Sequence, residues 1–125
     1  MSPAQHTAVI IDDDPHLRSF VTSILAKAGI SVHQAESVAK SIEAVAKHKP
    51  KLVICDLNMP EDSGFIFLDM REEHPFLKSL PVLIVTARKD KEAFEKAMSY
   101  ANTDFLVKPL DPQDLIDKAK KLLGV

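Results

Sequence analysis

Three carboxylates follow short apolar runs of this chain at the point where each run ends. Asp12 and Asp13 come directly after residues 8–11, and Asp56 comes directly after residues 52–55. An aspartate in this position often caps the turn after a strand, and for Asp56 alone this is the simpler interpretation. Neighbouring carboxylates, however, repel one another and raise each other's pKa unless a cation lies among them. A hard divalent cation with oxygen ligands, most plausibly Mg²⁺, would remove that conflict.

A hydroxyl and an ammonium group end the two later apolar runs. Thr86 follows residues 82–85, and Lys108 follows residues 105–107. Both groups donate hydrogen bonds, so together with a cation they would bind an anion. We therefore expect a site that holds a metal ion and an anion, provided that the fold brings the ends of these runs together.

Five apolar runs rich in branched residues alternate with segments of helical spacing. Apolar runs without polar alternation are typical of strands buried on both sides of a parallel sheet, and the alternation predicts an α/β domain with helices on both faces. Right-handed crossovers bring every strand's carboxyl end to one edge, where ligands of such sheets bind. The expected strands are residues 8–11, 30–35, 52–55, 82–85 and 105–107.

The expected helices have recognisable start and stop signals. Asp14 and Pro15 form the N-cap and first turn of the first helix, and Gly29 ends it. We assign Asp14 to this cap and not to a metal site. Asp111 and Pro112 open the last helix in the same way. An apolar stripe of the first helix comprises Leu17, Phe20, Val21, Ile24, Leu25 and Ala28. Weaker helices are expected at about 38–47, 64–73 and 90–99.

Composition narrows the class of protein. The chain has 125 residues, enough for one domain with its own core. Its 16 basic and 18 acidic side chains nearly cancel, so no basic footprint for direct nucleic-acid binding is indicated. We expect no membrane span and no signal peptide, and therefore a cytoplasmic location. The single cysteine, Cys55, excludes an internal disulfide, and the five histidines are expected at the surface or at helix ends.

Four motifs together resemble those of response-regulator receiver domains. They are "IIDDDPHLR", "ICDLNMPEDSGF", "LIVTAR" and "DFLVKPL", and they occur in the family's order and spacing over nearly the whole chain. The resemblance implies a flavodoxin-like, doubly wound five-stranded parallel sheet with strand order 2-1-3-4-5 and five helices on both faces. It also implies one receiver domain over residues 1–125, with a core at about residues 7–123.

The resemblance implies a role for each matching residue at the phosphoryl site. Asp56 would be the phosphoacceptor, which takes a phosphoryl group from a phosphohistidine of a partner. Thr86 and Lys108 would be the other catalytic residues and would bind phosphoryl oxygens, with a contribution from the N–H of Ala87. The chain would thus be a phosphoacceptor that promotes its own Mg²⁺-dependent phosphorylation and dephosphorylation, and not an enzyme acting on a separate substrate.

The metal ligands and the switch are likewise implied by the resemblance. Asp13 and Asp56 would bind Mg²⁺ directly, and the backbone carbonyl of Asn58 would complete the set. Asp12 would act mainly through water or by supporting the pocket. Thr86 and Phe105 would form the switch pair. Phe105 would turn inward as Thr86 moves toward the phosphoryl group. We also expect the Lys108–Pro109 bond to be cis.

The resemblance implies protein partners at two stages. A sensor histidine kinase or a histidine phosphotransfer protein would donate the phosphoryl group. A downstream protein target would bind the face of the fourth helix, fifth strand and fifth helix. The chain would be a monomer or a weak, phosphorylation-dependent dimer. It could be a stand-alone receiver or a piece of a longer protein.

Two other classes of function are weaker alternatives. A pseudo-receiver would keep the fold as an interaction module but lose acids, Thr or Lys, and none is lost here. A phosphatase of the haloacid-dehalogenase type would need Asp-x-Asp-x-Thr after a strand, and a flavodoxin-like carrier would need a Ser/Thr/Gly-rich loop; neither is present. One departure from the family is Ala101, where Gly is usual, so a left-handed backbone is expected at Asn102 instead.

Overall fold

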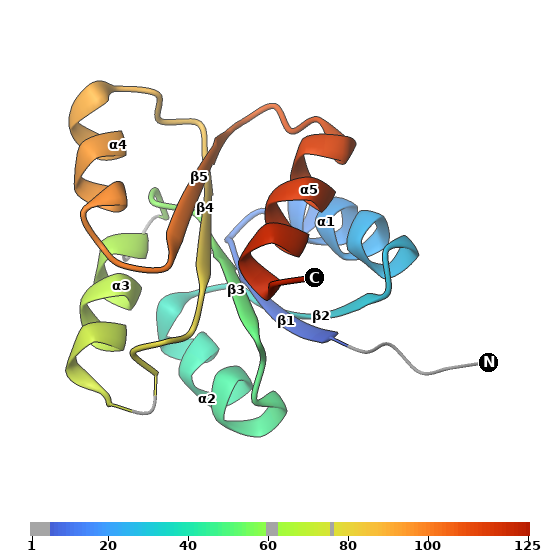
Figure 1. The fold of residues 1–125 in the computed structure, drawn as a ribbon, viewed down its shortest axis with the longest axis horizontal. Coiled ribbons are helices and arrows are strands. Elements are labelled where there is room, and N and C mark those ends of the chain that lie inside the picture. The colour runs from blue at the N-terminus through green and yellow to red at the C-terminus, as the bar shows by residue number, and fades with distance from the viewer. Residues whose placement is uncertain (1–5, 60–62, 76) are drawn as a thin grey trace.

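Five parallel strands form one sheet, and helices cover both of its faces (Figure 1). The computed structural model describes residues 6–59, 63–75 and 77–125. The strands are β1 (His6–Ile11), β2 (Ile30–Ala35), β3 (Leu52–Cys55), β4 (Val82–Thr86) and β5 (Thr103–Val107). The helices are α1 (Pro15–Lys27), α2 (Val38–His48), α3 (Gly64–Glu73), α4 (Lys91–Met98) and α5 (Pro112–Leu123). No helix in these described ranges is long and apolar enough to cross a bilayer.

The strand order is β2-β1-β3-β4-β5, with all pairs parallel, and it confirms the expected doubly wound topology. The chain reverses its direction of winding between β1 and β3, which are neighbours in the sheet. Side chains of β1 alternate between the two faces: Val9 and Ile11 join one core cluster, and Ala8 and Ile10 join the other. Both faces are buried, which explains why the strand runs are apolar throughout.

Two helices cover one face of the sheet, and three cover the other. In Figure 1, α1 and α5 lie on one side of the strands, and α2, α3 and α4 lie on the opposite side. The core cluster that contains Ala8 and Ile10 packs α1 and α5 residues such as Val21 and Leu115 against the sheet. The cluster on the opposite face packs Val45, Phe67 and Ala93 from the other three helices. The two layers hold the sheet rigid on both sides of its carboxyl edge.

Local backbone features expected from the sequence are confirmed. The Asp14 carboxylate accepts the His16 N–H at the start of α1, and Asp111 caps α5 in the same manner. Gly29 follows α1 with φ of 83°, and Asn102 adopts the left-handed region with φ of 53°. The Lys108–Pro109 peptide bond is cis.

Some boundaries and burials differ from the expectations. β1 begins at His6, β4 extends through Thr86, and β5 begins at Thr103, because these residues pair with neighbouring strands and pairing does not require apolar side chains. Phe20 is 39% exposed, although it falls on the predicted apolar stripe of α1. That stripe is wider than the strip of helix surface that one sheet can cover.

A buried arginine connects α3 to the loops that precede β4 and β5. The guanidinium group of Arg71 donates to the carbonyl oxygens of Leu80 at 2.9 Å and Ala101 at 2.7 Å, and to Thr103 Oγ1 at 3.0 Å. These bonds satisfy two backbone carbonyl groups, so Arg71 ties both loops to α3. Nothing in the sequence pattern of α3 indicated this role.

Gly64 allows the start of α3 to lie directly against the end of β3. A Cβ atom at this position would stand 2.3 Å from the Asp56 carbonyl oxygen and 3.1 Å from Cys55 Sγ. The contact with the Asp56 carbonyl oxygen is shorter than a side-chain carbon tolerates and is to backbone, whereas the contact with Cys55 is only tight. The backbone of Gly64 is helical, so its φ does not call for glycine. The close approach of α3 to the Asp56 carbonyl does.

Gly64→Ala should lower the free energy of unfolding by about 1–3 kcal/mol, because backbone must move to admit the methyl group. It should also shift the amide NMR signals of Asp56 and Leu57. Gly29→Ala is the matched control: nothing lies within 4 Å of its Cβ position. That variant should lower the free energy of unfolding by about 1 kcal/mol, because alanine is strained at a positive φ. It should leave the amide NMR signals of Asp56 unchanged. Equal NMR effects of the two variants would contradict this explanation.

Two histidines stack between β2 and the end of α2. The rings of His33 and His48 lie 3.4 Å apart at an interplanar angle of 6°. Burial lowers the pKa of His33, and the neighbouring His48 and Lys47 lower it further. His33 is half-buried on a strand, so the expectation that all histidines lie at the surface or at helix ends is wrong for this residue.

Acidification should therefore destabilise the fold through His33. Because its pKa is lower in the folded chain, the unfolded chain binds more protons, and the stabilisation present above about pH 6.5 is lost as the pH falls through the folded pKa. Urea unfolding of wild type and His33→Gln between about pH 8 and about pH 5 should show a shallower decline for the variant. His16→Gln, which changes an exposed histidine on α1, should decline as wild type does. Parallel curves for all three proteins would refute the assignment.

Candidate metal and phosphoryl site

The strand register brings the expected site residues to one edge of the sheet. Ile11 is paired with Cys55, so Asp12 and Asp56 leave β1 and β3 side by side. Thr86 is paired with Val107, the residue before Lys108, at the ends of β4 and β5. Side chains that are up to 96 positions apart in the sequence are thus neighbours at this edge.

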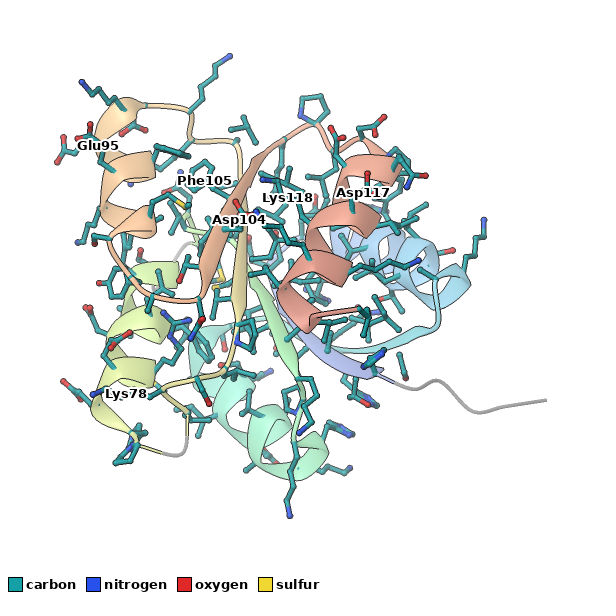
Figure 2. All side chains as sticks on the ribbon, viewed as in Figure 1. Lys78, Glu95, Asp104, Phe105, Asp117 and Lys118 are labelled. Atoms are coloured by element: carbon teal, nitrogen blue, oxygen red, sulfur yellow. The ribbon has the colours of Figure 1, made fainter. Side chains whose placement is uncertain are left out.

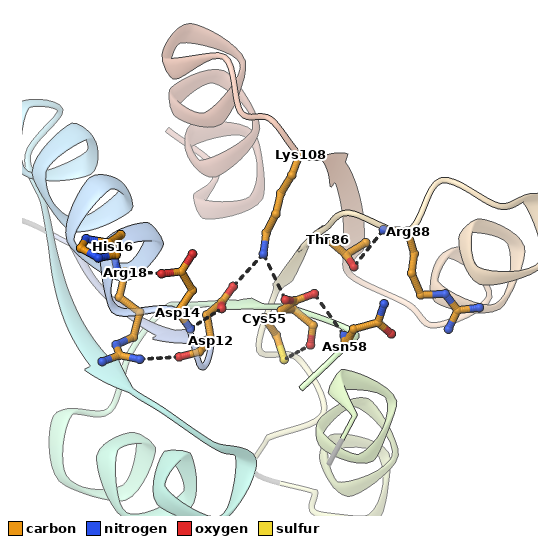
Figure 3. A network of polar contacts seen from close by, with 10 residues as sticks. Asp12, Asp14, His16, Arg18, Cys55, Asn58, Thr86, Arg88 and Lys108 are labelled. Atoms are coloured by element: carbon orange, nitrogen blue, oxygen red, sulfur yellow. Dashed lines mark hydrogen bonds and ion pairs between the residues drawn. The ribbon is translucent and has the colours of Figure 1, made fainter. Parts of the chain in front are cut away.

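Lys108 lies between the two buried carboxylates. Its Nζ atom donates hydrogen bonds to Asp12 Oδ2 and to Asp56 Oδ2, each at 3.1 Å, as the dashed lines of Figure 3 show. Burial lowers the pKa of Lys108, but the hydrogen bond that Lys108 donates to Asp56 and the charges of Asp12 and Asp56 outweigh burial and raise the pKa overall. The ammonium group is therefore held in its charged form, where it can pair with an anion.

Asp12 is a buried carboxylate with defined partners. It is 1% exposed, and its Oδ1 accepts the Asp14 N–H at 2.9 Å. Burial raises the pKa of Asp12 above its ordinary value, the Asp56 charge adds to the rise, and the Asp14 N–H and Lys108 oppose it. The Arg18 guanidinium donates to the Asp12 carbonyl oxygen at 2.7 Å and fixes the loop from the α1 side. The contact of Arg18 was not predicted from the sequence.

The donor atoms of this edge fit a hard cation. One carboxylate oxygen from each of Asp12, Asp13 and Asp56 lies within 4.8 Å of the others. Asp12 and Asp56 are buried, and Asp13 is exposed. Three carboxylates and only one nearby ammonium group leave an excess of negative charge, which a divalent cation with oxygen ligands would neutralise.

Asp56 is held at the end of β3 by its own loop. The residue is 6% exposed, and its Oδ1 accepts the Asn58 N–H at 3.1 Å. Asn58 is itself exposed and is bridged to Ser63 across the loop. Residues 60–62 of the "MPEDSG" motif lie outside the described residues. Cys55 is fully buried, in agreement with a structural role for this side chain.

Thr86 and Ala87 lie at the end of β4, beside the carboxylates. Thr86 is fully buried, and its Oγ1 accepts the Arg88 N–H at 3.3 Å. The hydroxyl proton remains available to a new acceptor, since this bond uses only the oxygen lone pair. Ala87 is exposed, as a backbone donor to an incoming anion must be.

Phe105 already lies inside the core. The side chain, labelled in Figure 2, is 7% exposed. It meets the ring of Phe94 edge-on, with centroids 5.4 Å apart. Phe94, on α4, is 47% exposed. The Phe105 side chain therefore lies in the inward position, in contact with α4.

Comparisons with known proteins agree with this geometry. The family model of the response regulator receiver domain matches residues 8–120. The chain is 32% identical over 113 residues to a protein of Leptolyngbya boryana described as "Uncharacterized 14.6 kDa protein in sodA1 3'region", covering 90% of this chain and 86% of that one. It is 34% identical to the C4-dicarboxylate transport transcriptional regulatory protein DctD of Pseudomonas aeruginosa, covering 98% of this chain but only 26% of that protein.

A solved structure supports the same assignment. The chemotaxis protein CheY4 of Vibrio cholerae superimposes with a TM-score of 0.87 at 26% identity, over 95% of this chain and 99% of that one. The matched family, the order of the strands and the acidic edge of the sheet all support the same family assignment. The chain belongs to the response regulator receiver domain family, whose general role in two-component signalling is to accept a phosphoryl group from a kinase at an acidic pocket that binds Mg²⁺.

Proposed function

We propose that Asp56 is the phosphoacceptor of this chain and that its phosphorylation changes the surface of α4, β5 and α5. The observation that carries this proposal is the contact of Lys108 Nζ with Asp56 Oδ2 and Asp12 Oδ2. This arrangement places a nucleophile, the Asp56 carboxylate, and a cation, the Lys108 ammonium group, side by side at one edge of the sheet, where both would meet a phosphoryl group. A pseudo-receiver would not need this set intact.

In the proposed transfer, a carboxylate oxygen of Asp56 attacks the phosphorus of a phosphohistidine on a kinase or a histidine phosphotransfer protein. The new P–O bond forms as the P–N bond breaks, and the imidazole leaves with the electron pair of that bond. Catalysis of this kind depends on positioning and charge neutralisation. Lys108 would pair with one phosphoryl oxygen, and the Thr86 hydroxyl and the Ala87 N–H would donate to others.

Asp13, Asp56 and the backbone carbonyl of Asn58 would hold Mg²⁺, with Asp12 supporting them mainly through water. The ion, when bound, supplies positive charge that neutralises the carboxylate and the phosphoryl oxygens. The same residues would position the water that later hydrolyses the acyl phosphate, so the chain would promote its own dephosphorylation without acting on a separate substrate.

The phosphoryl group would act by shifting a population. Thr86 can donate to a phosphoryl oxygen only in a state that brings its hydroxyl toward Asp56, and that state is then favoured. Burial of Phe105 against Phe94 would be coupled to this position of the Thr86 hydroxyl. Asp104 on β5 accepts both hydrogen bonds of Lys118 on α5 at 3.1 Å, so these two elements would shift together (Figure 2).

The altered face would bind a downstream protein. Exposed apolar side chains on it, Phe94, Met98 and Val107, support such a contact. A monomer, or a weak dimer that forms on phosphorylation, is the proposed state. The proposed location is the cytoplasm, where the family's kinases present their phosphohistidines, and this chain would make no direct contact with nucleic acid.

Incubation with Mg²⁺ and acetyl phosphate should add a single phosphoryl group to Asp56, detected by intact mass and by its sensitivity to hydroxylamine. Asp56→Asn should abolish the addition, because an amide is not a nucleophile here. Asp14→Asn is the matched control, since asparagine caps a helix as well as aspartate does. Label that persists in Asp56→Asn would show that the acceptor is another residue.

Mg²⁺ should bind at the acidic edge and perturb the amide NMR signals of Asp13, Asp56 and Asn58. Asp13→Asn should weaken binding by about tenfold or more, since it removes a charged ligand. Asp14→Asn should leave the affinity unchanged. Identical affinities of wild type and Asp13→Asn would remove Asp13 from the ligand set.

Thr86→Ala should still be phosphorylated on Asp56 but should lose most of the change in α4, β5 and α5. The two states differ by a coupling free energy of typically ~1–3 kcal/mol, and the Thr86 hydroxyl supplies it in this proposal. NMR shifts with and without beryllofluoride, a phosphoryl mimic, would be compared for wild type, Thr86→Ala and the control Thr22→Ala. A full response of Thr86→Ala would disprove the coupling and leave the phosphorylation chemistry standing.

A further inference from the structure

An apolar groove opens between α2 and α3 at the edge of the sheet opposite Lys108. Lys51 directly precedes β3 and Leu80 lies just ahead of β4, so the groove is at the amino ends of these strands. Its volume is about 570 Å³. Val45, Phe67 and Leu80 line it from the buried core. None of its lining residues belongs to the metal and phosphoryl site.

The size and surroundings of the groove favour a small molecule over a protein. Its volume falls within the range of about 300–1,000 Å³ that is typical of small-ligand sites. Of the large apolar side chains that are exposed in the described ranges, only Ile42 lines it; the others, such as Phe20 and Phe94, lie elsewhere. A protein partner would bury roughly 800 Å² on this side, and among the described residues Ile42 is the one large exposed apolar side chain that it would meet in the groove.

Two lysines are the charged side chains among the described residues that line the groove. They are Lys49 and Lys51, both exposed, and we call the part of the groove beside them its mouth. No carboxylate is among the lining residues that the structure describes, although acidic residues outnumber basic ones in the chain, 18 to 16. An apolar interior with cations at its mouth is complementary to an amphipathic anion.

Lys49 occupies a backbone position that normally favours glycine. It ends α2 in the left-handed region, with φ of 47° and ψ of 59°. The chain places glycine at the two comparable helix ends, Gly29 with φ of 83° and Gly124 with φ of 76°. A lysine in this region is strained relative to glycine. Lysine at position 49 therefore carries a conformational strain that glycine would avoid. The side chain that this strain accompanies lies at the mouth of the groove.

We propose that the groove binds a small amphipathic anion, an apolar chain that carries one carboxylate. The apolar part of the ligand would lie against Val45, Phe67 and the flexible side chain of Met70. There it would make the dispersion contacts that an open groove lacks. The carboxylate would pair with Lys49 and Lys51. This proposal is independent of the chemistry at Asp56.

Decanoate is the probe for this proposal, titrated below its micellar concentration into the uniformly labelled full chain. Saturable NMR shifts are expected at Ile42, Ala46, Met70 and Leu77, with a melting temperature that rises with decanoate concentration. Decyltrimethylammonium, which has the same chain and the opposite charge, should bind about tenfold more weakly or not at all, because the basic mouth repels it.

Two variants separate binding from folding. Lys49→Gly should melt no lower than wild type, since it relieves the left-handed backbone, yet should bind decanoate about three- to tenfold more weakly. Lys51→Gln should weaken binding to a similar extent. Lys78→Gln, which changes an exposed lysine that does not line the groove, should bind as wild type does. The proposal is overturned if shifts do not saturate, if they map to Phe94 and Met98, or if the two amphiphiles bind equally.

Discussion

Two buried carboxylates at the ends of neighbouring strands share one ammonium group. Asp12 and Asp56 are almost fully buried, and each lies 3.1 Å from Lys108 Nζ. Burying such charges costs several kcal/mol each unless they are paired. Removal of either acid would leave Lys108 less well neutralised, and removal of Lys108 would leave two like charges in contact. The arrangement is stable, but it still carries an excess of negative charge that a cation would neutralise.

The scaffold serves mainly to hold these groups against their mutual repulsion. Pairing of Ile11 with Cys55 sets the two acids side by side, and pairing of Thr86 with Val107 brings in Lys108. Gly64 lets α3 approach the Asp56 carbonyl, and Arg18 holds the Asp12 carbonyl from the other face. Both faces of the sheet are packed against helices, so the residues at this edge stand on a close-packed support.

The strands and helices, and the residues that lie at the carboxyl ends of the strands, could be predicted from the sequence, because unbroken apolar runs and the residues that end them are local signals. Parallel topology then required the ends to meet at one edge. The strand order came from the family resemblance and not from periodicity. Contacts such as those of Arg71 and Gly64 could not be predicted, because they depend on which backbone atoms a distant loop presents.

Lys108 compensates the charge of Asp56 at the carboxyl edge of the sheet. A double-mutant cycle of Asp56→Asn and Lys108→Met measures this pairing, with free energies of unfolding determined in EDTA. Residues in contact typically show interaction energies of about 0.5–3 kcal/mol, and we predict a favourable coupling in the upper part of that range. Lys108→Met should be destabilising in wild type and much less so in the Asp56→Asn background. Additivity within about 0.5 kcal/mol would contradict the account.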